Sequence, residues 1–186
     1  PTHNTPPGLA SAAAVAAAVA AAGRDLSLND VIESAAQAAT LGAQNYTGPP
    51  AFTPTPDLAR RIRWAVDLTR ACPAPGRDPR NWPEPVWQTL RELYDLVGAG
   101  MSAHETVPTA FALIALADGD PLTATLLAAN LGGDGDTIGA IAGAVCGAYR
   151  GLEAIPTEMV TTLEIVNGLD FRQLAQDYLD TISVFG

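Results

Sequence analysis

Two aspartates and a threonine lie within four residues of one another in the latter part of the chain. Asp134, Asp136 and Thr137 belong to the segment Gly-Gly-Asp-Gly-Asp-Thr-Ile-Gly, residues 132–139. Hard oxygen ligands at this spacing suit a divalent cation such as Mg²⁺, and carboxylates this close repel each other unless a cation or a proton lies between them. The same residues also suit a helix start, with Asp134 as the cap and Asp136 complementing the dipole. The spacing alone leaves both interpretations open.

The helix predicted to follow this turn carries a repeated glycine. Gly139, Gly143 and Gly147 recur every fourth residue and therefore share one helix face. Each glycine weakens a helix interior by about 1 kcal/mol relative to alanine, so the repeat indicates a neighbouring helix that packs very closely. A helix held in this way would fix the direction in which its first side chains point.

The apolar residues follow a helical period along almost the whole chain, and no segment alternates as a strand does. Ser27 and Asp30 form a capping box, Asp120 caps a helix that begins at Pro121, and the five prolines within residues 72–85 predict an irregular segment. Seven predicted helices cover residues 9–22, 86–97, 108–117, 121–130, 136–149, 156–166 and 171–182. Two more are predicted to begin at residues 28 and 56. The fold class is therefore an all-α, multi-helix domain.

Composition narrows the class of protein further. The 186 residues are 48% hydrophobic and 16% charged, which is typical of one soluble globular domain. The net charge of −10 disfavours binding to nucleic acid or to anionic membranes. Cys72 and Cys146 lie far apart and form no Cys-x-x-Cys pair, so we expect two reduced thiols and a cytoplasmic protein.

A resemblance to a known family appears in residues 130–144. This segment, Asn-Leu-Gly-Gly-Asp-Gly-Asp-Thr-Ile-Gly-Ala-Ile-Ala-Gly-Ala, resembles the C-terminal signature of the ADP-ribosylglycohydrolase family, which includes the dinitrogenase-reductase-activating glycohydrolases. Gly135 stands where that signature usually has threonine. The resemblance implies that Asp134, Asp136 and Thr137 are metal ligands beside ADP-ribose, with two Mg²⁺ ions as the expected cofactors and Mn²⁺ as a possible substitute.

Two further segments are similar to the same family. Residues 97–110 resemble its Gly-x-Gly…Glu-Ser-Val-Pro-x-Ala segment, which implies that Met101 lies beside the adenosine and that Glu105 orients the turn. Residues 1–7 are similar to its Thr-His step before an alanine-rich helix, which implies that His3 contacts the substrate. The residues alone leave another interpretation open for each position. Met101 would then be a core residue, and His3 would be an exposed residue at the chain terminus.

The resemblance also implies what the chain lacks. No Thr-Asp-Asp metal motif of the family occurs in the sequence, and no glycine-rich phosphate loop precedes a helix. We therefore expect residues 1–186 to be the C-terminal part of a single ADP-ribosylglycohydrolase-like domain. An N-terminal fragment or a companion chain would complete both the helical bundle and the site.

The function implied by the resemblance is hydrolysis. The expected enzyme is metal-dependent and cleaves an N- or O-glycosidic bond of ADP-ribose attached to a protein or to a nucleotide-like small molecule. Two alternatives stay open. One is an N-glycoside hydrolase that acts on nucleosides, and the other is a non-catalytic member that binds ADP-ribose or has a structural role.

Overall fold

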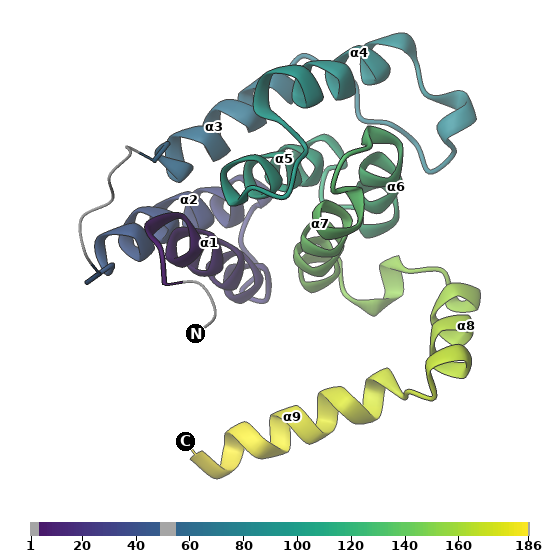
Figure 1. The fold of residues 1–186 in the computed structure, drawn as a ribbon. Helices are drawn as coiled ribbons and strands as arrows, with labels where there is room; N and C mark the ends of the chain where they lie inside the picture. Colours follow the sequence, from purple (N-terminus) through teal and green to yellow (C-terminus); the bar gives the residue numbers. More distant parts are fainter. Residues whose placement is uncertain (1–3, 49–54, 186) are drawn as a thin grey trace. The chain divides into compact units, whose positions relative to one another are not determined.

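The computed structural model describes residues 4–48 and 55–185, and every regular element in these ranges is helical (Figure 1). The α-helices are α1 (Pro6–Ala22), α2 (Leu28–Gln44), α3 (Leu58–Thr69), α4 (Glu84–Glu92), α5 (Ala103–Leu116), α6 (Pro121–Leu131), α7 (Gly135–Arg150), α8 (Thr157–Asn167) and α9 (Phe171–Phe185). Two short 3₁₀ turns, η1 (Pro79–Asn81) and η3 (Leu152–Ala154), and one π-helical turn, η2 (Leu93–Val97), complete the elements. The predicted all-α fold class is confirmed.

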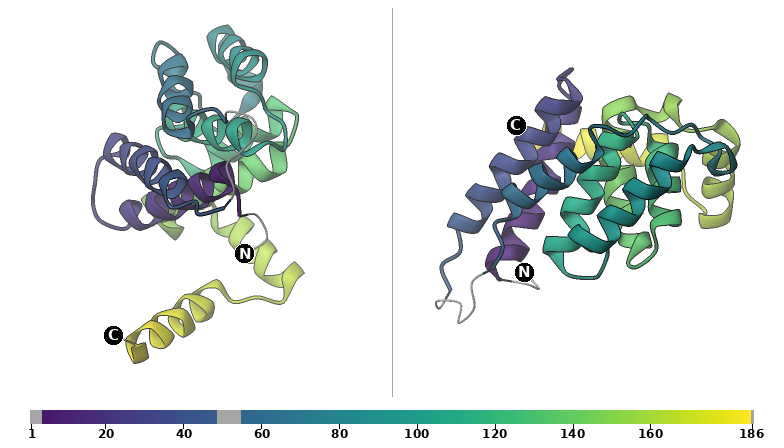
Figure 2. Two further views of the ribbon diagram at one scale, coloured as in Figure 1. Left: turned by 60° about the vertical axis from the view of Figure 1, so that its left-hand side comes forward. Right: turned by 90° about the horizontal axis from the view of Figure 1, so that it is seen from above.

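Residues up to Ala154 form one compact unit, which contains the motifs singled out in the sequence. Its helices pack in pairs, α1 with α2, α3 with α5 and α6 with α7, as the views in Figure 2 show. Helix α5 also touches α1, α2, α6 and α7, and Phe111, Leu113 and Ile114 on it are fully buried. The loops at both ends of α6 and before α5 are therefore attached to a rigid core.

Helix starts follow the side-chain signals in the sequence. Ser27 accepts a hydrogen bond from the Asp30 amide, and its hydroxyl donates to the Asp30 carboxylate at 2.6 Å. Asp120 caps α6 by accepting from the Thr123 amide at 2.8 Å, and it also pairs with Arg77. Partial burial acts to raise the pKa of Asp120, but the hydrogen bonds from Arg77 and Thr123 outweigh it and hold the pKa below its ordinary value.

Helix α5 begins at Ala103, five residues before the predicted start at Pro108. Proline has no N–H, so Pro108 leaves the carbonyl of His104, four residues earlier, without its helical partner. Nε of Arg61 on α3 donates to that carbonyl at 2.7 Å. A side chain from another helix thus replaces the missing backbone bond, and the helix continues through the proline.

The glycine face of α7 packs against α6 at two of the three predicted positions. A Cβ at Gly139 would lie 3.4 Å from the Cβ of Ala128, and one at Gly143 would lie 3.1 Å from Cγ2 of Thr125. A Cβ at Gly147 would meet nothing within 4 Å. Close packing therefore accounts for Gly139 and Gly143 and leaves Gly147 unexplained.

Residues from Ile155 onward form a second, small unit of two helices. Helix α8 ends at Asn167, and the following Gly168 adopts the left-handed conformation, with φ of 62°. Several large apolar side chains are exposed in this unit, including Ile165, Val166 and Tyr178. Across both units, no helix in the described ranges is long and apolar enough to cross a membrane.

Candidate metal site at the start of helix α7

The turn between α6 and α7 holds the three candidate metal ligands. Helix α6 ends at Leu131, and Gly132 and Gly133 adopt positive φ angles of 90° and 64°, which glycine tolerates without strain. This reversal brings Asp134 to the cap position of α7, with Asp136 in its first turn. Local glycine chemistry therefore places both carboxylates at one helix end.

The side chain of Asp134 does not cap the helix. It accepts no hydrogen bond from a backbone amide of the first turn, although the residue occupies the cap position. Its Oδ1 instead accepts a bond from the Thr137 hydroxyl at 3.0 Å, which puts two oxygen ligands side by side. Asp134 is half-buried, whereas Asp136 and Thr137 are exposed. The capping interpretation of Asp134 is therefore wrong for its side chain, whose carboxylate keeps capacity for another partner.

The donor set fits a hard divalent cation. Two carboxylates and one hydroxyl provide oxygen ligands only, which Mg²⁺ and Mn²⁺ prefer. A Mg²⁺ ion needs about six oxygen ligands in total. Within the described residues, no group of three or more His, Cys, Asp or Glu side chains is arranged to hold a metal. Three oxygen-bearing side chains are fewer than a complete Mg²⁺ shell requires.

A second loop holds the turn in place from the side. The amide of Asp134 donates to the carbonyl of Ala99 at 2.6 Å, although the two residues are distant in the sequence. The approach requires a glycine next to Asp134, because a Cβ on Gly133 would collide with the Ala99 carbonyl oxygen and lie 2.9 Å from its Cβ. The loop before α5 and the turn before α7 thus form one structural unit.

The loop that carries Ala99 is itself fixed by side chains of α5. The Glu105 carboxylate accepts from the Gly100 amide at 2.9 Å, and the Thr106 hydroxyl donates to the Gly100 carbonyl at 2.6 Å. The buried Thr109 hydroxyl donates to the Gly98 carbonyl at 2.6 Å. These bonds give Glu105 the turn-orienting position expected for it.

Arg61 ties the same loop to α3. Its guanidinium donates to the Val97 carbonyl at 2.6 Å, in addition to its bond to His104. Arg63 on the same helix pairs instead with Glu33, at 2.7 Å, whereas half-buried Arg61 bridges main-chain segments. No pattern in the sequence distinguishes these two arginines.

The other two candidate residues have different outcomes. Met101 follows the fixed loop and is 88% exposed, so the interpretation of Met101 as a core residue is wrong. His3, the predicted substrate contact near the N-terminus, lies outside the described residues.

The chain is thus an all-helical protein that presents two carboxylates and a hydroxyl at one helix start. Comparison with known proteins identifies the family. The chain belongs to the ADP-ribosylglycohydrolase family, whose model matches residues 1–184.

Individual relatives agree with the family match. The chain is 37% identical over 175 residues to the uncharacterized protein YegU of Escherichia coli (strain K12), an alignment that covers 94% of this chain and 48% of YegU. It is also 40% identical over 78 residues to ADP-ribosylhydrolase ARH3 of Bos taurus and 38% identical over 78 residues to ARH3 of Homo sapiens. Each of these two alignments covers 37% of this chain and about a fifth of the relative. The chain therefore spans about half the length of YegU. No solved structure matches it significantly.

Proposed function

We propose that the protein takes part in metal-dependent hydrolysis of the glycosidic bond between ADP-ribose and an acceptor, which is a protein residue or a nucleotide-like small molecule. Membership of the family and the similarity to ADP-ribosylhydrolase ARH3 support hydrolysis at ADP-ribose. The observation that carries the proposal is the Asp134 carboxylate, which makes no capping bond and lies beside the Thr137 hydroxyl. Two reduced cysteines fit a cytoplasmic location, which we also propose.

The proposed metal ligands are Asp134, Asp136 and Thr137, for two Mg²⁺ ions or for Mn²⁺ in their place. Bound cations of this kind polarise oxygen atoms and lower the pKa of a coordinated water. In this proposal the hydrogen bond from the Asp134 amide to the Ala99 carbonyl fixes the main chain that carries the Asp134 carboxylate before a ligand binds. The exposed side chain of Met101 offers an apolar surface to the adenosine.

We further propose that an N-terminal segment or companion polypeptide supplies the remaining ligands. The three oxygen-bearing side chains of the turn leave the rest of each coordination shell to water, substrate or other protein groups. YegU, which matches over 94% of this chain, is about twice as long as the aligned segment. Intact-mass analysis of the purified active material tests this point. We expect a second polypeptide or a longer chain, and activity of the 186-residue chain alone would exclude both.

Substitution of one ligand tests the proposed reaction. Asp136→Asn in the active assembly should reduce Mg²⁺-dependent release of ADP-ribose from a modified protein by at least about a hundredfold, because loss of an outer-shell contact alone costs up to that much. Asp67→Asn is the control, since Asp67 is an exposed carboxylate on α3 that pairs with Arg70. Equal turnover in both variants would refute the metal role.

A substrate panel separates the alternative functions. Faster cleavage of free nucleosides than of ADP-ribosylated protein would favour a nucleoside N-glycoside hydrolase. Binding of ADP-ribose without turnover would favour a non-catalytic reader, which is the alternative that Gly135 in place of threonine keeps open.

A further inference from the structure

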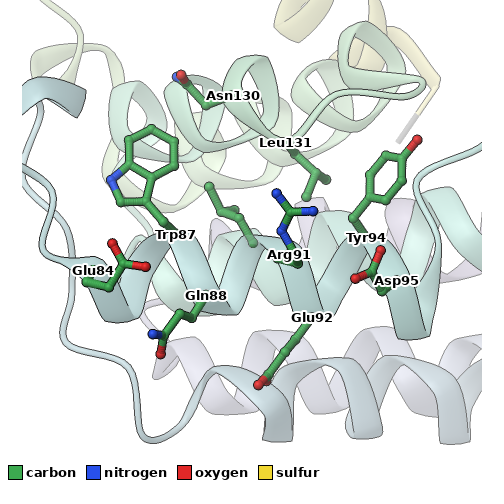
Figure 3. A pocket seen from close by; sticks show the side chains of 10 residues that line it. Glu84, Trp87, Gln88, Arg91, Glu92, Tyr94, Asp95, Asn130 and Leu131 are labelled. Atoms are coloured by element: carbon green, nitrogen blue, oxygen red, sulfur yellow. The ribbon is translucent and has the colours of Figure 1, made fainter.

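A cavity of about 570 Å³ lies between α4 and the end of α6 (Figure 3). This volume falls within the range typical of binding sites for small ligands and peptide segments. Trp87, Arg91 and Tyr94 line one wall, and Asn130 and Leu131 line the facing wall. The cavity takes no part in the metal site described above.

Its wall is contiguous with the metal-site turn. Leu131 is the last residue of α6, and Gly132, the first residue of the turn, follows it directly. A Cβ on Gly132 would lie 3.9 Å from the ring of Tyr94. Tyr94 therefore lines the cavity and also lies beside the first residue of the turn.

The first wall presents an aromatic, a cationic and a second aromatic side chain in a row. Trp87, Arg91 and Tyr94 follow at intervals of four and three residues, and Figure 3 shows all three on the same side of the helix. The row spans about 10 Å along the axis, at about 1.5 Å per residue. About three residues of an extended peptide have the same length.

The polar groups of the cavity are available to a ligand. Among the described residues, the guanidinium of Arg91 and the carboxylates of Glu84 and Asp95 have no hydrogen bond or ion pair within the chain. The Asn130 amide nitrogen donates to the Leu126 carbonyl at 2.8 Å, which leaves its Oδ1 free to accept. Donors and acceptors on both walls are what a peptide main chain requires.

The aromatic surface is pre-formed. Trp87 packs against buried Trp82, with ring centroids 5.2 Å apart and planes tilted by 48°. Trp82 is fixed in turn by a hydrogen bond from Nε1 to the Gly76 carbonyl at 2.6 Å. Trp87 therefore has little side-chain freedom to lose when a ligand stacks on it.

We infer that this cavity binds the acceptor, the peptide to which ADP-ribose is attached. An extended peptide with a basic side chain lies along the Trp87–Tyr94 row, and its modified residue points toward the metal-site turn. The inference rests on the proposed function, because it assigns the acceptor of that reaction. Charge selects the occupant. The three acidic residues that line the cavity, Glu84, Glu92 and Asp95, outnumber Arg91, so the cavity repels a nucleotide phosphate and attracts lysine or arginine. The two aromatic faces favour the same cationic side chains.

Peptide binding to the chain tests the inference without metal or ADP-ribose. Fluorescence anisotropy would compare labelled basic, neutral and acidic peptides of equal length with the wild type and two tryptophan variants. Trp87→Ala should weaken binding of the basic peptide about fivefold or more. Trp64→Ala is the matched control, because Trp64 on α3 is 40% exposed and Trp87 is 37% exposed. Glu84→Gln combined with Asp95→Asn should abolish the preference for the basic peptide.

Two results would overturn the inference. One is equal affinity of the Trp87 and Trp64 variants for the basic peptide, and the other is tighter binding of acidic peptides or ADP-ribose at the Trp87 wall. Failure of the proposed hydrolysis would be recognised separately. In that case the Asp136→Asn variant would turn over substrate normally while peptide binding still depended on Trp87.

Discussion

Gly133→Ala perturbs the contact that joins the two loops of the metal site. Gly133 has a φ of 64° and lies against Ala99, whose carbonyl accepts the hydrogen bond from the Asp134 amide. An added methyl group both strains the backbone of the turn and drives it away from the neighbouring loop. The variant therefore tests whether this contact positions Asp134.

The size of the effect follows from two terms. An alanine in the left-handed conformation costs about 1 kcal/mol. Separation of the loops loses the bond between Asp134 and Ala99, which is worth about 1 kcal/mol. The sum of about 2 kcal/mol corresponds to a fall in melting temperature of about 4–8 °C for a domain of this size.

Thermal unfolding and amide hydrogen exchange measure the two consequences. We expect a lower melting temperature and loss of protection at the Asp134 amide in Gly133→Ala. Gly147→Ala in α7 is the control, because a Cβ there meets nothing within 4 Å and alanine raises helix stability by up to about 1 kcal/mol. A Gly133→Ala protein as stable as the wild type, with the Asp134 amide still protected, would refute the reasoning.

Three further predictions concern the support of the site and the chemistry around it. Arg61→Ala should lower the free energy of unfolding, measured in urea, by about 2–3 kcal/mol, since it leaves two main-chain carbonyls without a donor. The control Arg63→Ala breaks an exposed ion pair and should lower it by less than about 1 kcal/mol. The pKa of Asp120 is lowered in the folded protein, so ionised Asp120 stabilises the fold at pH values above its ordinary pKa of 3.8, and this stability is lost as the pH falls through the lower folded-state pKa. The free energy of unfolding of Asp120→Asn should therefore fall less steeply with acid than that of the wild type. Burial raises the pKa of Cys146 to about 12, so a thiol reagent at about pH 8 should modify only the partly exposed Cys72, and rapid modification of both in the folded protein would contradict this.

Local signals in the sequence predicted most of the helices. Ser27 and Asp120 mark helix starts because a cap acts through residues within one turn, so the sequence contains the whole interaction. Pro108 misled the prediction, because the donor that replaces its missing amide is Arg61 on another helix. The π-helical turn Leu93–Val97 closes with a bond from the Gly98 amide to the Leu93 carbonyl. It was predicted as ordinary helix, because apolar spacing over one turn does not distinguish a π-helix from an α-helix.

The candidate site was predictable only in part. The spacing of Asp134, Asp136 and Thr137 is a local pattern, and the family to which it pointed is confirmed. The bond between Ala99 and Asp134 joins segments with no shared pattern, and alanine carries no side-chain signal for a main-chain contact. The cavity beside Trp87 likewise depends on how α4 and α6 meet, which helical periodicity does not specify.

Manganese binding at the turn tests the central proposal most directly. Crystals of the active assembly grown with Mn²⁺ would be measured at the manganese absorption edge, for the wild type and for the Asp134→Asn, Asp136→Asn double variant. We predict anomalous density within bonding distance of the Asp134 and Asp136 carboxylates in the wild type and its loss in the variant. Density elsewhere, with both carboxylates bonded only to protein groups, would contradict the assignment of these residues as metal ligands.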